Sequence, residues 1–353
     1  MKNQNILCKT HYEDLVEYIN SGRFSIIKSF DIITSPEFPR AVTYEEFYTS
    51  HPILVRAVES MSYPEEFVST LANIFFHAYC LHHNGEKFYH IRPQLAMNLK
   101  NTDINIDAHF LQSPFREIFI QIDPGLYDIT DVYTLENWPV TGFYVNLLEK
   151  TDCKEIRIMA TAKRPKKSNS PVPSGDFDDS IFYFKLYIKP GKIQDSVKDT
   201  IKNLRNGHAD AINGGEHNID NIEKIFNFVL NTLLYITSKD PDIVKLLPYD
   251  FLTEVKGLKN PVKKRKVLAR AAKHTAKEIL VIGQKVLSPY AIHDKKTGEF
   301  QWQLDKRVFV SGHWRVQWYG TDKDNTKIAK VIYIEPYEKG PEFAEQSGRH
   351  YHR

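Results

Sequence analysis

The chain has 353 residues, of which 42% are hydrophobic and 26% are charged, the proportions of an ordinary soluble globular protein. Its formal net charge of +3 excludes a global polycation, so any contact with RNA must come from a local basic patch. The cysteines, Cys8, Cys80 and Cys153, have neither metal-ligand spacing nor the pattern of a disulfide framework, and we expect no metal and no other cofactor. Charge interrupts the first residues too early for a signal peptide or a membrane span, so we expect a cytoplasmic protein.

The first segment, residues 1–110, is predicted to be mainly helical. Its apolar spacing predicts helices at Glu13–Asn20, Tyr44–Met61 and Pro64–His82. The last of these begins with a proline in its first turn and carries an apolar face, both typical of a packed helix.

The second segment, residues 111–256, begins where the apolar period changes to two. Runs rich in Ile, Val, Phe and Tyr predict strands at Glu117–Ile122, Gly142–Leu148, Glu155–Ala162 and Ile181–Ile188. Short turn-like connections favour a mostly antiparallel sheet. Helices are predicted at Gly191–Asn206 and Ile219–Thr237, and the wide apolar stripe of the second indicates that it covers the sheet. The predicted fold class is therefore α+β.

The third segment, residues 257–353, opens with the most basic stretch of the chain. Its centre is a run of four cations, Lys263, Lys264, Arg265 and Lys266. Such a run binds phosphates by releasing their counterions, so it is a candidate contact for RNA or the ribosome. Solvated surface is an equally good interpretation of a charge run. A strand is predicted after it, at Glu278–Val286.

The chain closes with a predicted β-hairpin, Phe309–Tyr319 and Ile328–Glu335, joined by turn residues at 320–325. Because side chains alternate along a strand, Trp314 and Trp318 fall on an apolar face. The opposite face carries His313, Arg315, Gln317 and Tyr319. On the return strand, Tyr333 and Glu335 fall on one face and Ile328, Ile332 and Ile334 fall on the other. If the register aligns the two polar faces, His313, Arg315, Gln317, Tyr333 and Glu335 form one cluster.

Three interpretations of this cluster remain open. His313 oriented by Glu335 suits general-base chemistry, with Arg315 holding an anion, although no nucleophile accompanies the pair. Planar Arg, amphipathic Tyr and Gln equally suit a recognition surface for a peptide or protein. A structural network that satisfies buried polar groups is the third interpretation.

The hairpin residues resemble the C-terminal signature of an anti-CRISPR family carried by phages and plasmids, whose named member blocks the type V-A CRISPR system. The likeness rests on Gly312-His313-Trp314-Arg315, followed by Gln317, Gly320 and the Pro336-Tyr337 close. Shorter similarities precede it in the same order: Ile118–Asp123, Gly142-Phe143-Tyr144 and Pro241-Asp242-Ile243. Members commonly carry an Arg before the Gly-His-Trp run, where this chain has Ser311, with Arg307 four residues earlier.

The resemblance implies a non-enzymatic regulator in a bacterial cytoplasm. Such a protein recognises the nascent N-terminal polypeptide of a CRISPR effector nuclease on the ribosome and triggers loss of its mRNA, with a host nuclease as a further partner and no membrane involved. His313, Arg315, Gln317, Tyr319, Tyr333 and Glu335 are then the candidate peptide-binding residues. The alternatives are an RNA-cleaving hydrolase that uses His313 and Glu335, and a structural protein of a mobile element.

Overall fold

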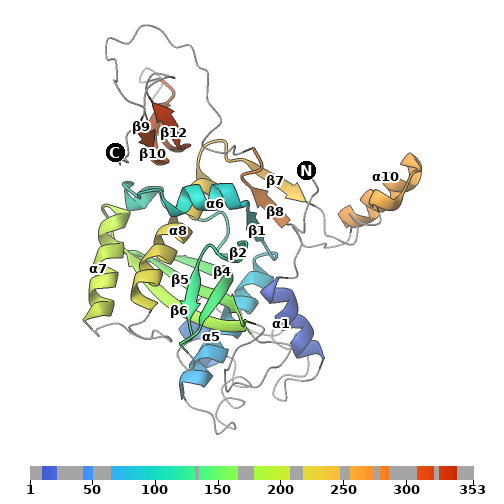
Figure 1. The fold of residues 1–353 in the computed structure, drawn as a ribbon, viewed down its shortest axis with the longest axis horizontal. Helices are drawn as coiled ribbons and strands as arrows, with labels where there is room; N and C mark the ends of the chain where they lie inside the picture. The colour runs from blue at the N-terminus through green and yellow to red at the C-terminus, as the bar shows by residue number, and fades with distance from the viewer. Residues whose placement is uncertain are drawn as a thin grey trace.

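The computed structural model describes residues 10–21, 43–50, 65–131, 135–165, 179–206, 218–246, 255–273, 279–285, 308–321 and 326–339. Its centre is an eight-stranded mixed sheet in the order β6-β5-β4-β2-β1-β8-β7, with β3 paired to β4 (Figure 1). The strands are β1 Phe88–Ile91, β2 Glu117–Gln121, β3 Asp128–Thr130, β4 Asn137–Glu149, β5 Lys154–Lys163, β6 Asp179–Ile188, β7 Ile243–Leu246 and β8 Ile279–Ile282.

The predicted α+β class with a mostly antiparallel sheet is confirmed. The exception is the middle of the sheet, where β1 runs parallel to both β2 and β8. Parallel neighbours need a long crossover, and residues 92–116 supply one between β1 and β2. Sequence patterning missed β1 because a buried run of four residues is too short to show a period.

One face of the sheet is covered by α6 (Pro93–Lys100), α7 (Ile193–Arg205) and α8 (Ile219–Thr237), together with the short 3₁₀ helix η1 (Ala108–Phe110) (Figure 1). The core beneath them is almost wholly apolar and includes Phe143, Phe226 and Phe228. The predicted bounds of α8 are confirmed at both ends, because its wide apolar stripe packs along its whole length.

The other face is covered by α1 (His11–Asn20), α3 (Tyr44–Ser50) and α5 (Glu65–His83). Helix α1 begins two residues before its predicted start, because Thr10 and Glu13 form a reciprocal capping box. Residues 51–61 of the predicted Tyr44–Met61 helix lie outside the described residues. Of the helices that the structure describes, none is both long and apolar enough to cross a membrane.

The core on this second face contains a fully buried polar network. Glu117 lies 2.8 Å from His77 Nδ1 and accepts a 2.8 Å hydrogen bond from the Asn146 amide. Burial raises the pKa of Glu117, against the stabilising effect of His77 and Asn146 on its charged form. Nearby, buried Arg157 donates to Glu155, Glu45 and the Tyr183 hydroxyl. Buried polar groups are usually partnered, and this network partners its carboxylates and Arg157, whereas His77 Nε2 has no hydrogen-bond partner among the described residues.

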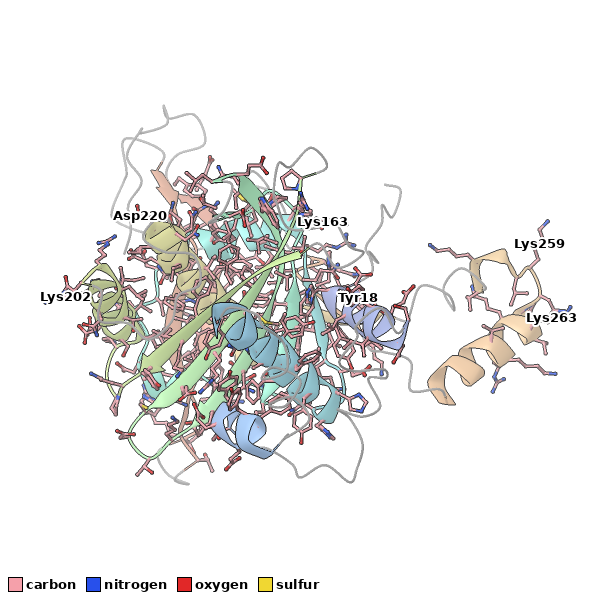
Figure 2. The ribbon with its side chains drawn as sticks, turned by 90° about the horizontal axis from the view of Figure 1, so that it is seen from below. Tyr18, Lys163, Lys202, Asp220, Lys259 and Lys263 are labelled. Atoms are coloured by element: carbon pink, nitrogen blue, oxygen red, sulfur yellow. The ribbon has the colours of Figure 1, made fainter. Side chains whose placement is uncertain are left out.

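Two small antiparallel sheets complete the described chain, β9 (Val308–Val310) with β12 (Tyr337–Lys339) and β10 (His313–Tyr319) with β11 (Ile328–Ile334). The predicted strand Phe309–Tyr319 is thus interrupted at Ser311-Gly312. Residues 322–325 of the predicted turn lie outside the described residues. The basic stretch forms helix α10 (Pro261–Lys273), which stands away from the sheet in both views (Figures 1 and 2).

All three predicted segments contribute strands to the main sheet: β1 from the first, β2 to β7 from the second and β8 from the third. The division at 110 and 256 stays a prediction about the organisation of the sequence.

Candidate functional site

The β10–β11 hairpin has an inner face that packs on the body of the protein. Trp314 lies opposite Tyr333 in the strand register, and their rings are 4.9 Å apart. Tyr333 also meets the ring of Tyr235 on α8, at 5.6 Å. Trp314 and Val331 are both buried in the larger core. The expectation that the apolar face of this strand is core is confirmed for Trp314 and wrong for Trp318, which is exposed.

A hydrogen-bond relay fixes this inner face. Trp314 Nε1 donates to Asn231 Oδ1 at 2.7 Å, and Asn231 Nδ2 donates to the carbonyls of Leu99 and Thr102 at 2.9 and 2.8 Å. Leu99 lies in the last turn of α6 and Thr102 lies two residues past its end, where carbonyls no longer meet the amide of a following helical turn. One buried amide on α8 thus joins the last turn of α6 to the hairpin.

Gly312 makes the close approach of the hairpin sterically feasible. A Cβ at this position would overlap the Tyr333 hydroxyl and lie 3.1 Å from Thr102 Oγ1. The two hydroxyls are themselves 3.2 Å apart. The space that a side chain at 312 would need is occupied by this pair, so only glycine fits.

The outer face of the hairpin carries four of the predicted site residues, His313, Arg315, Gln317 and Tyr319. In the antiparallel register they lie opposite Ile334, Ile332, Lys330 and Ile328. Arg315 is exposed and donates to Gln317 Oε1 at 2.9 Å, while His313 Nδ1 lies 3.2 Å from the Ser311 carbonyl oxygen.

The predicted single polar cluster is not formed, because the register pairs Tyr333 with Trp314 and not with His313. The sequence pattern assigned each strand its two faces correctly but left their relative register undetermined. The isoleucines of β11 accompany His313 and Arg315, and Tyr333 lies on the inner face.

Glu335, one residue past the end of β11, is exposed and lies near the inner tyrosines. Burial is the main cause that raises the pKa of Tyr235 to about 12 and raises the pKa of Tyr333 as well, and the Glu335 carboxylate adds to both shifts. His313 makes its hydrogen bond to Ser311 and has none to Glu335. The geometry of the described hairpin therefore gives no acid–base pair for the hydrolase hypothesis.

A profile of the AcrVA2-like family, the anti-CRISPR type V subtype A2 family, matches residues 89–337. The chain belongs to the AcrVA2-like family. Among solved structures it is similar to the crystal structure of AcrVA2, with 11% identity and a TM-score of 0.48, over 93% of this chain and 99% of that chain. No match was found among curated proteins.

The structure places the residues of the Gly312-His313-Trp314-Arg315 run and Gln317 on two faces of the hairpin. Gly312 and Trp314 fix the hairpin to α6 and α8, whereas His313, Arg315 and Gln317 lie on its outer face. The earlier motif around Pro241 is also structural, because the Asp242 carboxylate accepts from the Lys285 amide and its carbonyl accepts from Gly283 at 2.9 Å. The outer face holds the signature side chains that packing does not explain.

The four predicted RNA-contact residues, Lys263, Lys264, Arg265 and Lys266, lie on α10 and are all exposed. Asn260 Oδ1 accepts from the Val262 and Lys263 amides at 2.9 and 3.3 Å and so caps the helix. The first turn carries no acidic residue. Cations at the positive end of the helix dipole disfavour the isolated helix and make this end attractive to an anion. Figure 2 shows Lys263 pointing away from the sheet.

Asn231 is the residue of this site that patterning missed. It is fully buried in the second half of α8, within a stripe that is mostly apolar. An amide inside an apolar stripe is the available signal, because a buried polar side chain requires partners. What the sequence does not indicate is that those partners come from α6 and the C-terminal hairpin.

Proposed function

We propose that this AcrVA2-like protein represses synthesis of a CRISPR effector nuclease by binding its nascent N-terminal polypeptide at the outer face of the β10–β11 hairpin. Loss of the nuclease mRNA follows from that capture during translation. The protein acts on the ribosome-bound chain and is not itself the nuclease that removes the message.

The division of the signature between two faces is the observation that carries the proposal. The hydrogen bonds that the described structure gives the outer side chains are local: Arg315 donates to Gln317, and His313 pairs with a neighbouring carbonyl. Side chains on the outer face of a docked hairpin are available to a partner. Arg and Gln suit the carbonyls and carboxylates of a peptide.

The backbone of β10 offers the second element of a peptide site. In the described chain β10 is hydrogen-bonded to β11 along one edge, and its sheet has two strands. An extended peptide adds to such an edge by main-chain pairing, while side chains beside it give specificity. The half-buried Ile332 and Ile334 flank Arg315 and His313 and would receive apolar side chains of the peptide.

Helix α10 supplies a contact with RNA or the ribosome. Its cations stand clear of the sheet, and it presents them at a helix N-terminus. A peptide-binding face and a separate basic helix suit a protein that binds a nascent chain while the ribosome still holds that chain.

The test measures capture and repression together. Purified protein is incubated with ribosomes stalled on the first codons of the effector nuclease, and the retained nascent chain is quantified; nuclease mRNA is measured in cells that express the same variants. We expect His313→Ala and Arg315→Ala each to abolish capture and to restore the mRNA, with unchanged thermal unfolding.

Lys202→Ala on α7 is the matched control, since Lys202 is an exposed cation on a different element (Figure 2). Wild-type repression by both hairpin variants would refute the assignment of the outer face. Cleavage of the message by purified protein without ribosomes would refute the non-enzymatic mechanism.

A further inference from the structure

The end of the hairpin farthest from Gly312 combines aromatic rings with lysines. We define this distal end by Trp318 and Tyr319 on β10, Lys327 and Lys330 at β11, and Lys239 just after α8. Lys239 Nζ lies 4.0 Å from the centre of the Tyr319 ring and Lys330 Nζ lies 5.9 Å from it. Lys327 Nζ lies 5.7 Å from the centre of the Trp318 ring. Each ring is thus accompanied by at least one ammonium group.

Packing does not account for the exposed ring of Trp318. Trp318 is 61% exposed although it follows Trp314, which is 9% exposed, on the same face. The core ends at Val316 and Val331, and Trp318 extends beyond it opposite Ala329. A tryptophan that lies outside the core has exposed ring surface available to a ligand.

The described strands of this region carry cations and no acidic residue, whereas the segment that joins them carries Asp322 and Asp324 as well as Lys323. Neither β10 nor β11 contains an Asp or a Glu, and between them they carry Arg315 and Lys330. The acidic group beside Lys239 is Asp240, whose carboxylate lies 3.7 Å from Lys239 Nζ and is itself 86% exposed. Cations that flank exposed rings are the combination that binds single-stranded nucleic acid, because the phosphates pair with the cations while the unpaired bases stack on the rings.

We propose that the distal end of the hairpin binds single-stranded RNA. Trp318 and Tyr319 are consecutive at the end of β10, so their rings lie on opposite sides of one strand end, and a strand of RNA that crosses this end meets both. Lys239, Lys327 and Lys330 contact its phosphates. The site is separate from α10 and does not depend on peptide capture by His313 and Arg315.

Stacking favours RNA over an acidic peptide as the occupant. Lysines alone would suit either, but an exposed tryptophan gains little from a carboxylate side chain. Single-stranded RNA also fits better than a duplex, whose bases are already stacked and whose major groove is too narrow for a side chain.

The experiment measures binding of a fluorescein-labelled single-stranded RNA of about 12 nucleotides by fluorescence anisotropy, a length within the usual range for one binding fold. We expect Trp318→Ala to weaken binding about 5- to 150-fold, the range for loss of one stacked base. Trp318→Phe should restore most of the affinity. Replacing Lys239, Lys327 and Lys330 with Gln should lower the slope of log affinity against log salt by about 0.7 for each phosphate that the protein no longer neutralises.

Controls separate this site from other surfaces. Lys202→Gln should leave affinity unchanged, and the effect of Trp318→Ala should persist when the α10 cations are reversed. Trp318→Ala should also retain nascent-peptide capture, so failure of this proposal is distinguishable from failure of the proposed function. Wild-type affinity in Trp318→Ala would overturn the proposal. Equal competition by polyglutamate of matched charge, or tighter binding of the corresponding duplex, would overturn it as well.

Discussion

The hydrogen bond between Trp314 and Asn231 is the most direct test of how the hairpin is held. Trp314→Phe keeps an aromatic ring but removes the Nε1 donor, leaving Asn231 Oδ1 buried without its 2.7 Å partner. Asn231 is fully buried, so the cost is that of an unsatisfied acceptor, about 1–3 kcal/mol. We expect that loss in the free energy of unfolding, measured by urea denaturation.

Asn231→Leu should cost more, because it also removes the Nδ2 donor from the Leu99 and Thr102 carbonyls. With Leu at 231, Trp314→Phe no longer removes a hydrogen bond and should cost correspondingly less. The double-mutant cycle should therefore give an interaction energy of about 0.5–3 kcal/mol.

Trp318→Phe is the matched control, since it makes the same change on the same strand at an exposed position. Its effect should stay within about 0.5 kcal/mol, as for other surface substitutions. If Trp314→Phe is equally neutral, or if the two substitutions are additive, the relay does not hold the hairpin and the reasoning fails.

Three other parts of the molecule can be tested in the same way. Gly312→Ala should lower the thermal unfolding midpoint and weaken hairpin docking, because the new Cβ overlaps the Tyr333 hydroxyl, and Tyr333→Phe should partly rescue it; a fully stable Gly312→Ala protein would contradict this. Burial lowers the pKa of His11 from 6.5 to about 3, so below pH 6.5 the unfolded chain gains a proton that the folded one does not. The free energy of unfolding should therefore decrease as the pH is lowered from 6.5 to 3. In His11→Gln this decrease should be smaller by about 1.4 kcal/mol per pH unit, and equal slopes in the two proteins would contradict this. Reversing the charges of Lys263, Lys264, Arg265 and Lys266 should weaken co-sedimentation with ribosomes in a salt-dependent manner, whereas unchanged co-sedimentation would exclude α10 from that contact.

Local sequence pattern correctly predicted the elements that have a long apolar stripe or a long run of strand-forming residues. The apolar stripe of α8 and the runs of Ile, Val, Phe and Tyr in β2, β4, β5 and β6 were sufficient, because each extends over several residues. Elements whose existence depends on distant partners were missed. Strand β1 is such a case, since its four buried residues become a strand only between β2 and β8.

The hairpin shows the same limit at the level of the site. Alternation placed Trp314 inward and Arg315 outward, and both placements are correct. Sequence alternation could not predict the pairing register between β10 and β11, because a slip of one residue moves every side chain of a strand to the other face. Tyr333 therefore left the predicted polar cluster, and Asn231, from another segment, became the residue that holds the hairpin.

The position of β1 also constrains when this protein can fold. Its two neighbours are β2, at Glu117–Gln121, and β8, at Ile279–Ile282. The centre of the sheet therefore closes only after most of the chain has been synthesised, a high-contact-order arrangement of the kind that folds slowly. Until then β1 presents an open edge, which other strands can pair with. A chain interrupted before residue 279 would keep that edge exposed. An inhibitor proposed to act on unfinished proteins is thus itself dependent on nearly complete synthesis.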